Sequence, residues 1–208
     1  MAKDRRREVP MPSIEAVENE RRRIRHKRAY RRALRSTIYV LVIVAAAAVL
    51  ISSLLLPVLQ ISGDSMDPTL FNGDIIVLIK TGFFKTGDLC AFAWNNKTLI
   101  KRIIAGPGQW VYIKEDGTVY VGEAKDKLIE IDEPYVNPEH KSIGEYCDID
   151  FAEDGPYQVP DDCYFAMGDK RDISVDSRNK KIGSISKAQI MGRVWLRVYP
   201  FKNSGYVR

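Results

Sequence analysis

Two serines and one lysine of this 208-residue chain stand out because their surroundings could make them a nucleophile and its base. Ser62 and Ser65 lie in the stretch SGDSMDPTL (62–70), which mixes turn-forming residues with acidic ones. Lys101 lies in the apolar stretch TLIKRIIAGPG (98–108). A serine hydroxyl becomes a useful nucleophile when a neighbouring group accepts its proton. The chemistry open to this chain therefore depends on which base it offers.

Histidine is the usual base beside a nucleophilic serine, but this sequence offers no good candidate. Of the two histidines, His26 lies in a basic N-terminal segment and His140 lies in the polar stretch NPEHKS. A Ser-His-Asp triad would have to use His140, and a lone histidine in a polar loop is usually solvated. No histidine or cysteine pair has the spacing of metal ligands. We therefore predict no metal site and no cofactor.

A lysine can replace histidine as the base if its amine is neutral near the working pH. Burial among apolar groups favours the neutral amine by lowering its pKa. Lys101 has the required apolar sequence neighbours, Ile100, Ile103 and Ile104, whereas Lys80 stands at a predicted strand end next to a turn. Lys101 is thus the candidate base, and the alternative is an outward-facing strand position.

A third candidate stretch is GDKRDISVDSR (168–178), which follows an apolar stretch at 163–167. It packs three aspartates, two serines and three basic residues into a short segment. On composition alone, it fits a polar surface loop.

An uncharged segment precedes the first candidate stretch and would tether it. Residues 37–59 are apolar, and as a helix they would reach about 34 Å, enough to cross a hydrocarbon core of about 30 Å. Pro57 is expected to end or kink this helix. A buried core helix and a cleaved signal peptide are the alternatives, but the segment is long for a signal peptide. We predict a retained signal anchor that crosses the membrane once.

The basic character of the chain is confined to its N-terminus. Residues 1–36 contain 13 Lys and Arg against 5 Asp and Glu, whereas the remaining chain contains 19 against 22. The positive-inside rule then places the N-terminus in the cytoplasm and residues from about 60 onward outside the cell. We interpret the tail as a topology signal, with ribosome or anionic-lipid binding as the alternative.

The remainder, residues 60–208, is predicted to be a mainly β catalytic domain. Short apolar stretches alternate with turn signals, and Asp116-Gly117 between two of them predicts a hairpin. The predicted strands are 74–80, 88–94, 98–105, 110–115, 118–122, 163–168 and 190–200. A helical turn at 186–191 is possible, and residues 123–162 form a long irregular section. Cys90 is predicted to be buried; Cys147 and Cys163 could form a disulfide outside the cell, or all three thiols could be free.

Four ordered stretches resemble the boxes of the type I signal peptidases, which are membrane-anchored Ser/Lys proteases. These are SGDSMDPTL (62–70), NGDIIVL (72–78), IKRIIAGPG (100–108) and GDKRDISVDSRNKKIG (168–183). The GDSM form is similar to the Gram-positive branch of this family. The resemblance covers about residues 37–200, implies an antiparallel β-sheet catalytic domain, and makes 123–162 a non-catalytic insertion.

The resemblance assigns a role to each matching residue. Ser65 is the nucleophile, and its backbone N–H serves the oxyanion hole. Lys101 is the general base, and Ser174 hydrogen-bonds and orients its amine. Supporting charges and pocket residues complete the site: an Asp176–Arg178 ion pair with Arg102 nearby, and Ile61, Met66, Leu70 and Ile100 around shallow apolar pockets.

The chain departs from the family boxes at four positions. Gly63 replaces a serine whose hydroxyl completes the oxyanion hole in part of the family, so backbone donors, Ser62 or a water must suffice here. The other departures are Asn72 in place of Arg, Gln109 in place of Asp and Lys170 in place of Asn. Neither Gln109 nor Lys170 touches the predicted dyad.

The predicted function is removal of signal peptides from secreted preproteins by a membrane-bound serine endopeptidase. The expected partners are secretory preproteins with small residues before the cut and the lipid bilayer, with a secretion translocon as a plausible addition and no nucleic acid. The alternatives are a non-catalytic membrane-anchored β scaffold derived from a peptidase, and a self-cleaving Ser/Lys protease of the SOS-repressor type. The membrane span and the lack of a helix-turn-helix signal disfavour the latter.

Overall fold

The computed structural model describes residues 13–207, apart from the side chains of residues 51–55. The chain divides into two compact units, Met1–Ser52 and Ser53–Arg208. Helix α1 accounts for the described part of the first unit almost entirely, and all strands found within residues 13–207 belong to the second unit. Residues 1–12 of the predicted basic tail lie outside the described residues.

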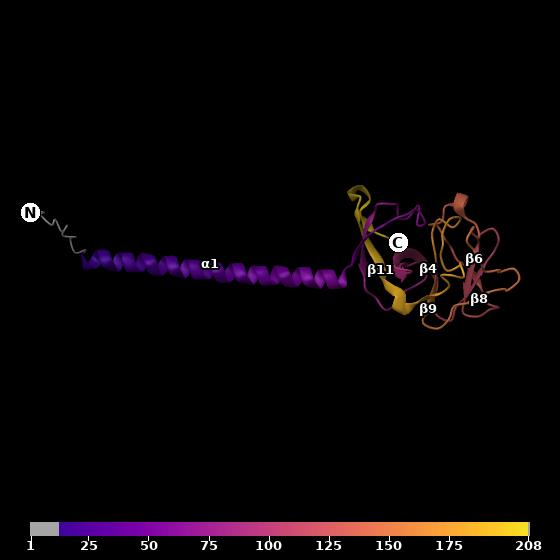
Figure 1. Cartoon of the computed structure of the whole chain (residues 1–208), viewed down its shortest axis with the longest axis horizontal. Helices are drawn as coiled ribbons and strands as arrows, with labels where there is room; N and C mark the ends of the chain where they lie inside the picture. Colours follow the sequence, from indigo (N-terminus) through magenta and orange to yellow (C-terminus); the bar gives the residue numbers. More distant parts are fainter. Residues whose placement is uncertain (1–12, 208) are drawn as a thin grey trace, which may run out of the picture. The chain divides into compact units, whose positions relative to one another are not determined.

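Helix α1 runs without a break from Ile14 to Leu55 (Figure 1). Its portion Ile14–Leu50 is long and apolar enough to cross a membrane, judged by length and composition alone. The predicted span needs correction at its end, because the helix stops at Leu55 and Val58 begins strand β1 (Val58–Gln60). Pro57 explains the stop, since proline disfavours a helical conformation in the residue before it.

The larger sheet has eight strands in the order β1-β2-β11-β3-β4-β9-β10, and β12 pairs with β11 outside this path. All of its pairings are antiparallel, which confirms the predicted mainly β fold. Its remaining strands are β2 (Ile75–Ile79), β3 (Leu89–Trp94), β4 (Lys97–Ala105), β9 (Cys163–Met167), β10 (Ile185–Ser186), β11 (Ile190–Tyr199) and β12 (Gly205–Tyr206).

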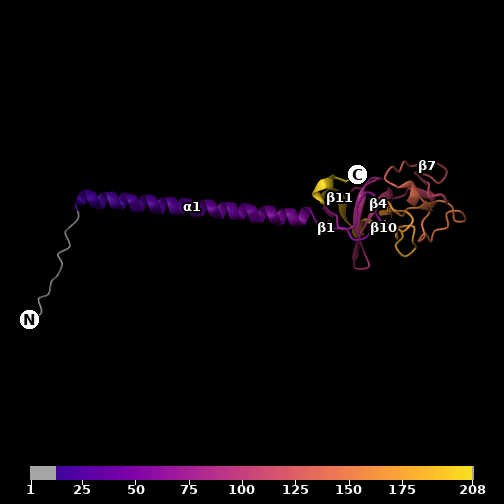
Figure 2. The same ribbon diagram turned by 90° about the horizontal axis from the view of Figure 1, so that it is seen from above.

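The smaller sheet has four strands in the order β7-β6-β5-β8. Its members are β5 (Trp110–Ile113), β6 (Val119–Gly122), β7 (Ile129–Glu130) and β8 (Tyr157–Gln158). The predicted hairpin joins β5 to β6, and Gly117 occupies its turn with φ of +83°, which favours glycine. Within the β unit, β7 lies at the end away from β1 (Figure 2).

Three buried apolar clusters hold the β unit together, and one of them joins the two sheets. Side chains of β4 and β9 pack there against side chains of β5 and β6, with Phe151 and Val159 from the irregular section. The other two clusters include residues of the larger sheet. The strand carrying Lys101 is therefore fixed by packing against the smaller sheet.

The cysteines and the short helices settle details that the sequence left open. All three cysteines are free, which is one of the two alternatives for Cys147 and Cys163, and Cys147 donates from its Sγ to the Ile149 carbonyl. Cys90 is buried, as predicted. Short 3₁₀ helices lie at Pro138–His140, Lys187–Gln189 and Phe201–Asn203, and the second of these falls where one helical turn was predicted.

Candidate active site

The side chains of Lys101 and Ser65 meet although 36 residues separate them. The Lys101 Nζ lies 2.6 Å from the Ser65 Oγ. Strand β4 holds Lys101 opposite Cys90 of β3, and only 3% of Lys101 is exposed. The alternation of side chains along a strand left open whether Lys101 points inward or outward. Its burial shows that it points inward. Lys80, the other lysine considered, is exposed.

Burial lowers the pKa of Lys101 from 10.5 to about 8. Asp176 opposes this shift because its negative charge favours the ammonium form, whereas the positive charge of Arg178 adds to the shift. Burial also raises the pKa of the neighbouring Cys90 thiol to about 12. Lys101 is therefore neutral in a sizeable fraction of molecules near pH 8, and a neutral amine can accept a proton from Ser65.

A tight turn holds Ser65 and leaves its backbone N–H without a hydrogen-bond acceptor among the described residues. Gly63 precedes it with φ of +99°, and the Gly63 N–H donates to the Asn72 side chain at 3.2 Å. The Asp64 backbone carbonyl accepts a hydrogen bond from the Asp67 amide at 3.1 Å. Within residues 13–207, no acceptor is found for the Ser65 N–H. This N–H is thus available to a developing oxyanion, whereas the Gly63 N–H is already occupied.

Gly168 brings the loop after β9 against the nucleophile. A Cβ at this position would overlap the Ser174 Oγ and lie 2.6 Å from the Ser65 carbonyl oxygen. The Lys170 amide donates to that same Ser65 carbonyl at 3.2 Å. Only glycine allows so close an approach between loop and nucleophile.

The predicted hydrogen bond from Ser174 to Lys101 is absent from this structure. The Ser174 Oγ is buried and has no hydrogen-bond partner among the described side chains and backbone. Lys101 donates to Ser65 instead, and Ser174 lies against Gly168. An unpaired buried hydroxyl is costly, by about 1–3 kcal/mol, which singles Ser174 out in this site.

Asp176 and Arg178 form a buried ion pair, with 2.8 Å between Arg178 Nη2 and Asp176 Oδ2. Burial of Asp176 disfavours its charged form, but the charge and hydrogen bonds of Arg178 outweigh this effect, and its pKa lies below the ordinary value. Asp176 also accepts from the Gly168 amide at 2.9 Å. Arg178 donates to the carbonyls of Ile143, Arg171 and Ser174. The pair therefore sets the shape of the loop.

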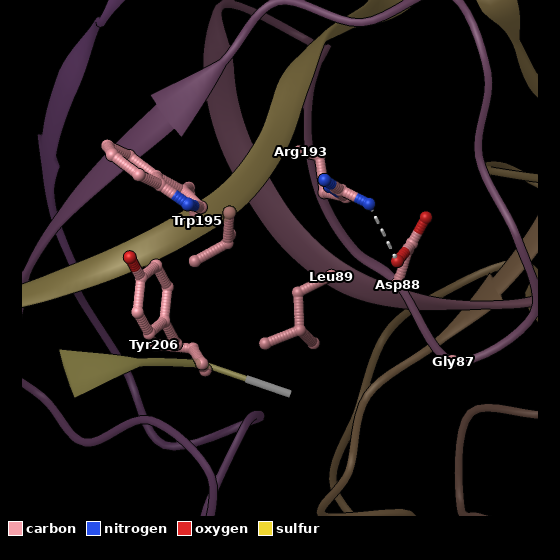
Figure 3. Close-up of a pocket in the computed structure, with 8 residues that line it drawn as sticks. Gly87, Asp88, Leu89, Arg193, Trp195 and Tyr206 are labelled. Atoms are coloured by element: carbon pink, nitrogen blue, oxygen red, sulfur yellow. Dashed lines mark hydrogen bonds and ion pairs between the residues drawn. The ribbon is translucent and has the colours of Figure 1, made fainter.

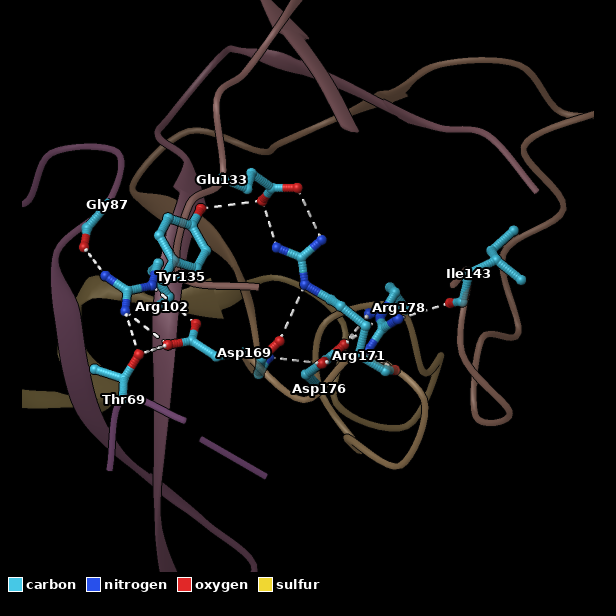
Figure 4. Close-up of polar contacts among 11 residues, drawn as sticks. Thr69, Gly87, Arg102, Glu133, Tyr135, Ile143, Asp169, Arg171, Asp176 and Arg178 are labelled. Atoms are coloured by element: carbon cyan, nitrogen blue, oxygen red, sulfur yellow. Dashed lines mark hydrogen bonds and ion pairs between the residues drawn. The ribbon is translucent and has the colours of Figure 1, made fainter. Parts of the chain in front are cut away.

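Arg102 is not part of the Asp176–Arg178 pair and forms its own ion pair with Asp169 (Figure 4). The two Asp169 oxygens accept from Arg102 at 2.8 and 2.6 Å. Thr69, in the turn after Ser65, donates to Asp169 at 2.5 Å and accepts from Arg102 at 3.2 Å. Arg102 therefore links β4 to the Ser65 turn and to the loop at 168–178.

A groove of about 110 Å³ opens beside the Ser65–Lys101 pair. Three of the predicted pocket residues line it, Ile61, Met66 and Ile100. Leu70 does not: it is fully buried in the apolar cluster of the larger sheet, so its predicted pocket role is wrong. The other lining residues are Leu59, Gln60, Ser62, Gly63, Thr98 and Leu99.

A larger cavity of about 470 Å³ contains neither member of the pair (Figure 3). It lies where Trp195 and Tyr206 approach Leu89, with an Arg193–Asp88 contact of 3.4 Å. The Arg193 side chain is 40% exposed. This cavity offers no nucleophile beside a base, so the smaller groove is the better candidate site.

Sequence reasoning missed several residues around the site. Asp169 lies within a recognised motif, and its membership of that motif was the available signal. Glu133 and Tyr135 lie in the irregular section, far from the boxes in sequence, and contact Arg171 and Arg102. No sequence signal would have found these contacts. Over residues 13–207, no group of His, Cys, Asp and Glu could hold a metal ion.

Comparison with known proteins agrees with this geometry. A family model for signal peptidase, peptidase S26, matches residues 34–199. The chain belongs to the peptidase S26 family of signal peptidases. This membership confirms the resemblance predicted from the motif boxes and makes the chain an enzyme, a signal peptidase.

Several S26 relatives are more than one third identical to the chain. Signal peptidase I of Bacillus licheniformis is 35% identical over 170 residues, which cover 77% of this chain and 86% of the relative. Signal peptidase I S of Bacillus subtilis is 36% identical, with the same coverage of 77% and 86%. Signal peptidase IB of Staphylococcus aureus is 36% identical over 70% and 79%. These relatives support the predicted Gram-positive type.

One solved structure in this family is also similar, a signal peptidase I from Enterococcus faecalis. It is 24% identical, covers 53% of this chain and 96% of its own, and has a TM-score of 0.39.

Proposed function

We propose that the protein is a membrane-bound endopeptidase that removes signal peptides from secretory preproteins with a Ser65–Lys101 dyad. The observation that carries this proposal is the 2.6 Å contact between the Lys101 Nζ and the Ser65 Oγ. The lowered pKa of Lys101 supports it, because an ammonium could not act as the base. The names of the S26 relatives supply the substrate class.

In the proposed reaction, the Ser65 Oγ attacks the scissile carbonyl carbon while Lys101 takes its proton. The open Ser65 N–H donates to the oxyanion that forms. Lys101 then gives the proton to the leaving amine, and the acyl-enzyme remains. A water attacks this ester with Lys101 again as base, and Ser65 is regenerated with release of the new carboxylate.

The charged residues around the dyad are proposed to hold it in place. Asp176 and Arg178 shape the loop that covers Lys101, and Arg102 ties β4 to the Ser65 turn through Asp169. Ser174 is proposed to turn its unpaired hydroxyl to the Lys101 amine when the proton moves. The close packing at Gly168 supports this role, because a Cβ there would meet both the Ser174 hydroxyl and the Ser65 carbonyl.

The groove beside Ser65 is proposed to select small side chains before the cut. Its volume of about 110 Å³ and its apolar residues Ile61, Met66 and Ile100 suit short apolar side chains. We expect the preference at the first and third positions before the cleavage point.

Helix α1 is proposed to anchor the enzyme in the membrane, with its N-terminus in the cytoplasm and the β unit outside. Ten residues separate Leu55 from Ser65, which limits their distance to about 33–36 Å in a fully extended chain. The anchor would thus keep the dyad near the membrane surface, where a signal peptide leaves the bilayer, and raise its local concentration.

The proposal is tested with the full chain in detergent micelles and a secretory preprotein as substrate. Ser65→Ala and Lys101→Met should each reduce cleavage by about 1,000-fold or more, because both groups act in one unit. Ser204→Ala and Lys80→Met are matched controls at exposed positions and should cleave normally. Normal cleavage by Ser65→Ala would refute the dyad.

A further inference from the structure

A part of the irregular section braces the loop that follows β9. This bracing segment, residues 133–148, lies outside all four motif boxes. Several hydrogen bonds join it to the chain after β9: the amides of Glu145 and Asp148 donate to it, and the carbonyls of Ile143 and Tyr146 accept from it. His140 adds a contact of 2.8 Å from its Nδ1 to Asp172. The segment therefore does more than connect two strands.

Glu133 makes the most buried of these contacts. Its carboxylate pairs with both terminal nitrogens of Arg171, one of them at 3.0 Å, and the two side chains are 4% and 0% exposed. Arg171 in turn donates from Nε to the Gly168 carbonyl at 3.1 Å. Gly168 is the residue that touches both Ser65 and Ser174. A single arginine thus links Glu133 to Gly168, the glycine packed beside Ser65.

Tyr135 connects the same carboxylate to the strand that carries the base. Its hydroxyl donates to Glu133 at 3.0 Å, and its ring lies 3.8 Å from the Arg102 Cζ (Figure 4). Burial, with the charge of Glu133 next to it, raises the pKa of Tyr135, so its hydroxyl stays protonated at neutral pH. Arg102 directly follows Lys101 in β4.

We propose that Glu133 and Tyr135 are positioning residues for the dyad, a role that rests on the proposed function. They hold two arginines at once, Arg102 on the strand of the base and Arg171 on the loop beside the nucleophile. Without this link, the loop at Gly168 could shift relative to β4, and water would reach the Lys101 amine. Hydration favours the ammonium form and raises the pKa of a buried lysine.

The effect on Lys101 can be separated from effects of other charges. The largest effects of neighbouring groups on its amine come from Asp176, Arg178 and Asp169, with the Cys90 thiol on the paired strand. Loss of the Glu133 carboxylate would by itself lower the pKa of Lys101, because a negative charge favours the ammonium form. An upward shift of the pH profile would therefore report a change in geometry or hydration at Lys101.

The experiment uses the full chain in detergent micelles, a secretory preprotein, and titration of active sites with an acylating inhibitor. The variants are Glu133→Gln and Tyr135→Leu, with Tyr135→Phe as the conservative variant that keeps the ring over Arg102. Glu139→Gln is the matched control, an exposed carboxylate in the same segment. For each we would measure kcat, KM, Tm and the dependence of kcat/KM on pH.

We expect Glu133→Gln and Tyr135→Leu to lower kcat per titrated site by about 10- to 100-fold, with KM changed by less than about twofold. The acidic limb of their pH profiles should move upward by about half a unit or more. Tyr135→Phe should lose less than Tyr135→Leu, and Glu139→Gln should match the wild type.

A lower Tm with unchanged kcat per site and an unchanged pH profile would mean a purely structural role and would overturn the proposal. If Glu133→Gln does not fold, the pair Tyr135→Leu and Tyr135→Phe decides alone: equal, wild-type kcat in both would overturn it. The dyad is tested separately by Ser65→Ala. An inactive Ser65→Ala beside a fully active Tyr135→Leu would refute the bracing role and leave the dyad intact.

Discussion

The groove at Ser65 and the larger cavity at Trp195 differ in the charged residues that surround them. The groove of about 110 Å³ at Ser65 adjoins a buried lysine and ion pairs whose side chains are at most 2% exposed. The cavity of about 470 Å³ at Trp195 has one ion pair, Arg193–Asp88, and its side chains are 40% and 21% exposed. The larger cavity therefore has fewer and more exposed charged side chains than the groove.

The difference indicates that buried charge marks the reactive site better than volume does. Removing a charge from water is costly unless hydrogen bonds and opposite charges compensate it. The groove maintains such an arrangement around one lysine, and the lowered pKa of Lys101 is its chemical result. The larger cavity has no comparable group. Three pairs of variants test this difference.

The largest effect is expected at Gly168. Gly168→Ala would place a methyl group against the Ser174 Oγ and the Ser65 carbonyl oxygen, so the loop must move away from the nucleophile. We expect kcat to fall by about 100-fold or more. Gly82→Ala is the control, because its added methyl group would meet only the end of the Lys187 side chain, at 3.9 Å. Preprotein cleavage with active-site titration measures both, and equal activities would contradict the close approach.

The next effect concerns the stability of the two kinds of ion pair. Asp169→Asn leaves Arg102 buried without its counter-charge, a change that typically costs about 3–5 kcal/mol. Arg193→Ala removes a partly exposed pair and should cost less than about 1 kcal/mol. Thermal unfolding of the full chain in detergent should therefore show a drop of roughly 6–20 °C for the first variant and a few degrees at most for the second. Equal drops in Tm would mean that the ion pairs beside the groove and beside the larger cavity contribute equally to stability.

The smallest effect is expected at Asn72, which hydrogen-bonds the turn beside the groove. Asn72→Ala removes the acceptor of the Gly63 N–H and loosens the turn that presents the Ser65 amide. A hydrogen bond of this kind contributes about 1 kcal/mol, so kcat should fall by about fivefold. Tyr206→Ala alters the larger cavity and should change kcat by less than about twofold. Steady-state cleavage at pH 8 compares the two variants. A larger loss of kcat for Tyr206→Ala would indicate that the larger cavity, and not the groove, is the active site.

The sequence predicted the strands well because alternating apolar residues and Gly-containing turns are local signals. Strands predicted at 88–94 and 190–200 lie at Leu89–Trp94 and Ile190–Tyr199. The very short strands were missed because two or three residues carry no detectable period; β7 and β10 are examples. The apolar span was drawn on to Leu59 because Val58 and Leu59 are apolar in either conformation, although Pro57 was correctly expected to end or kink the helix.

For the site, the sequence could supply residue types but not all of their partners. An apolar setting favoured Lys101, and the structure buries it. The same reasoning failed for Leu70, because apolar character fits a pocket wall and a core equally well. The contacts of Glu133 and Tyr135 depend on a fold that brings an irregular segment beside β4 and the loop after β9. Such long-range pairings leave no periodic pattern in a single sequence.

The central claim, that neutral Lys101 activates Ser65, is tested most directly by the rate at which an acylating inhibitor labels Ser65 at different pH values. Deprotonation of Lys101 supplies the base, so the rate should rise about tenfold per pH unit below the pKa and level off above about 8. Asp176, with its lowered pKa, stays ionised throughout and should not contribute to this rise. Mass spectrometry of the labelled chain from pH 5 to about 9.5 gives the rate, with Lys101→Met measured in parallel. We expect a rise and plateau in the wild type and negligible labelling of Lys101→Met. A flat profile, or equal labelling of both proteins, would mean that Lys101 is not the base.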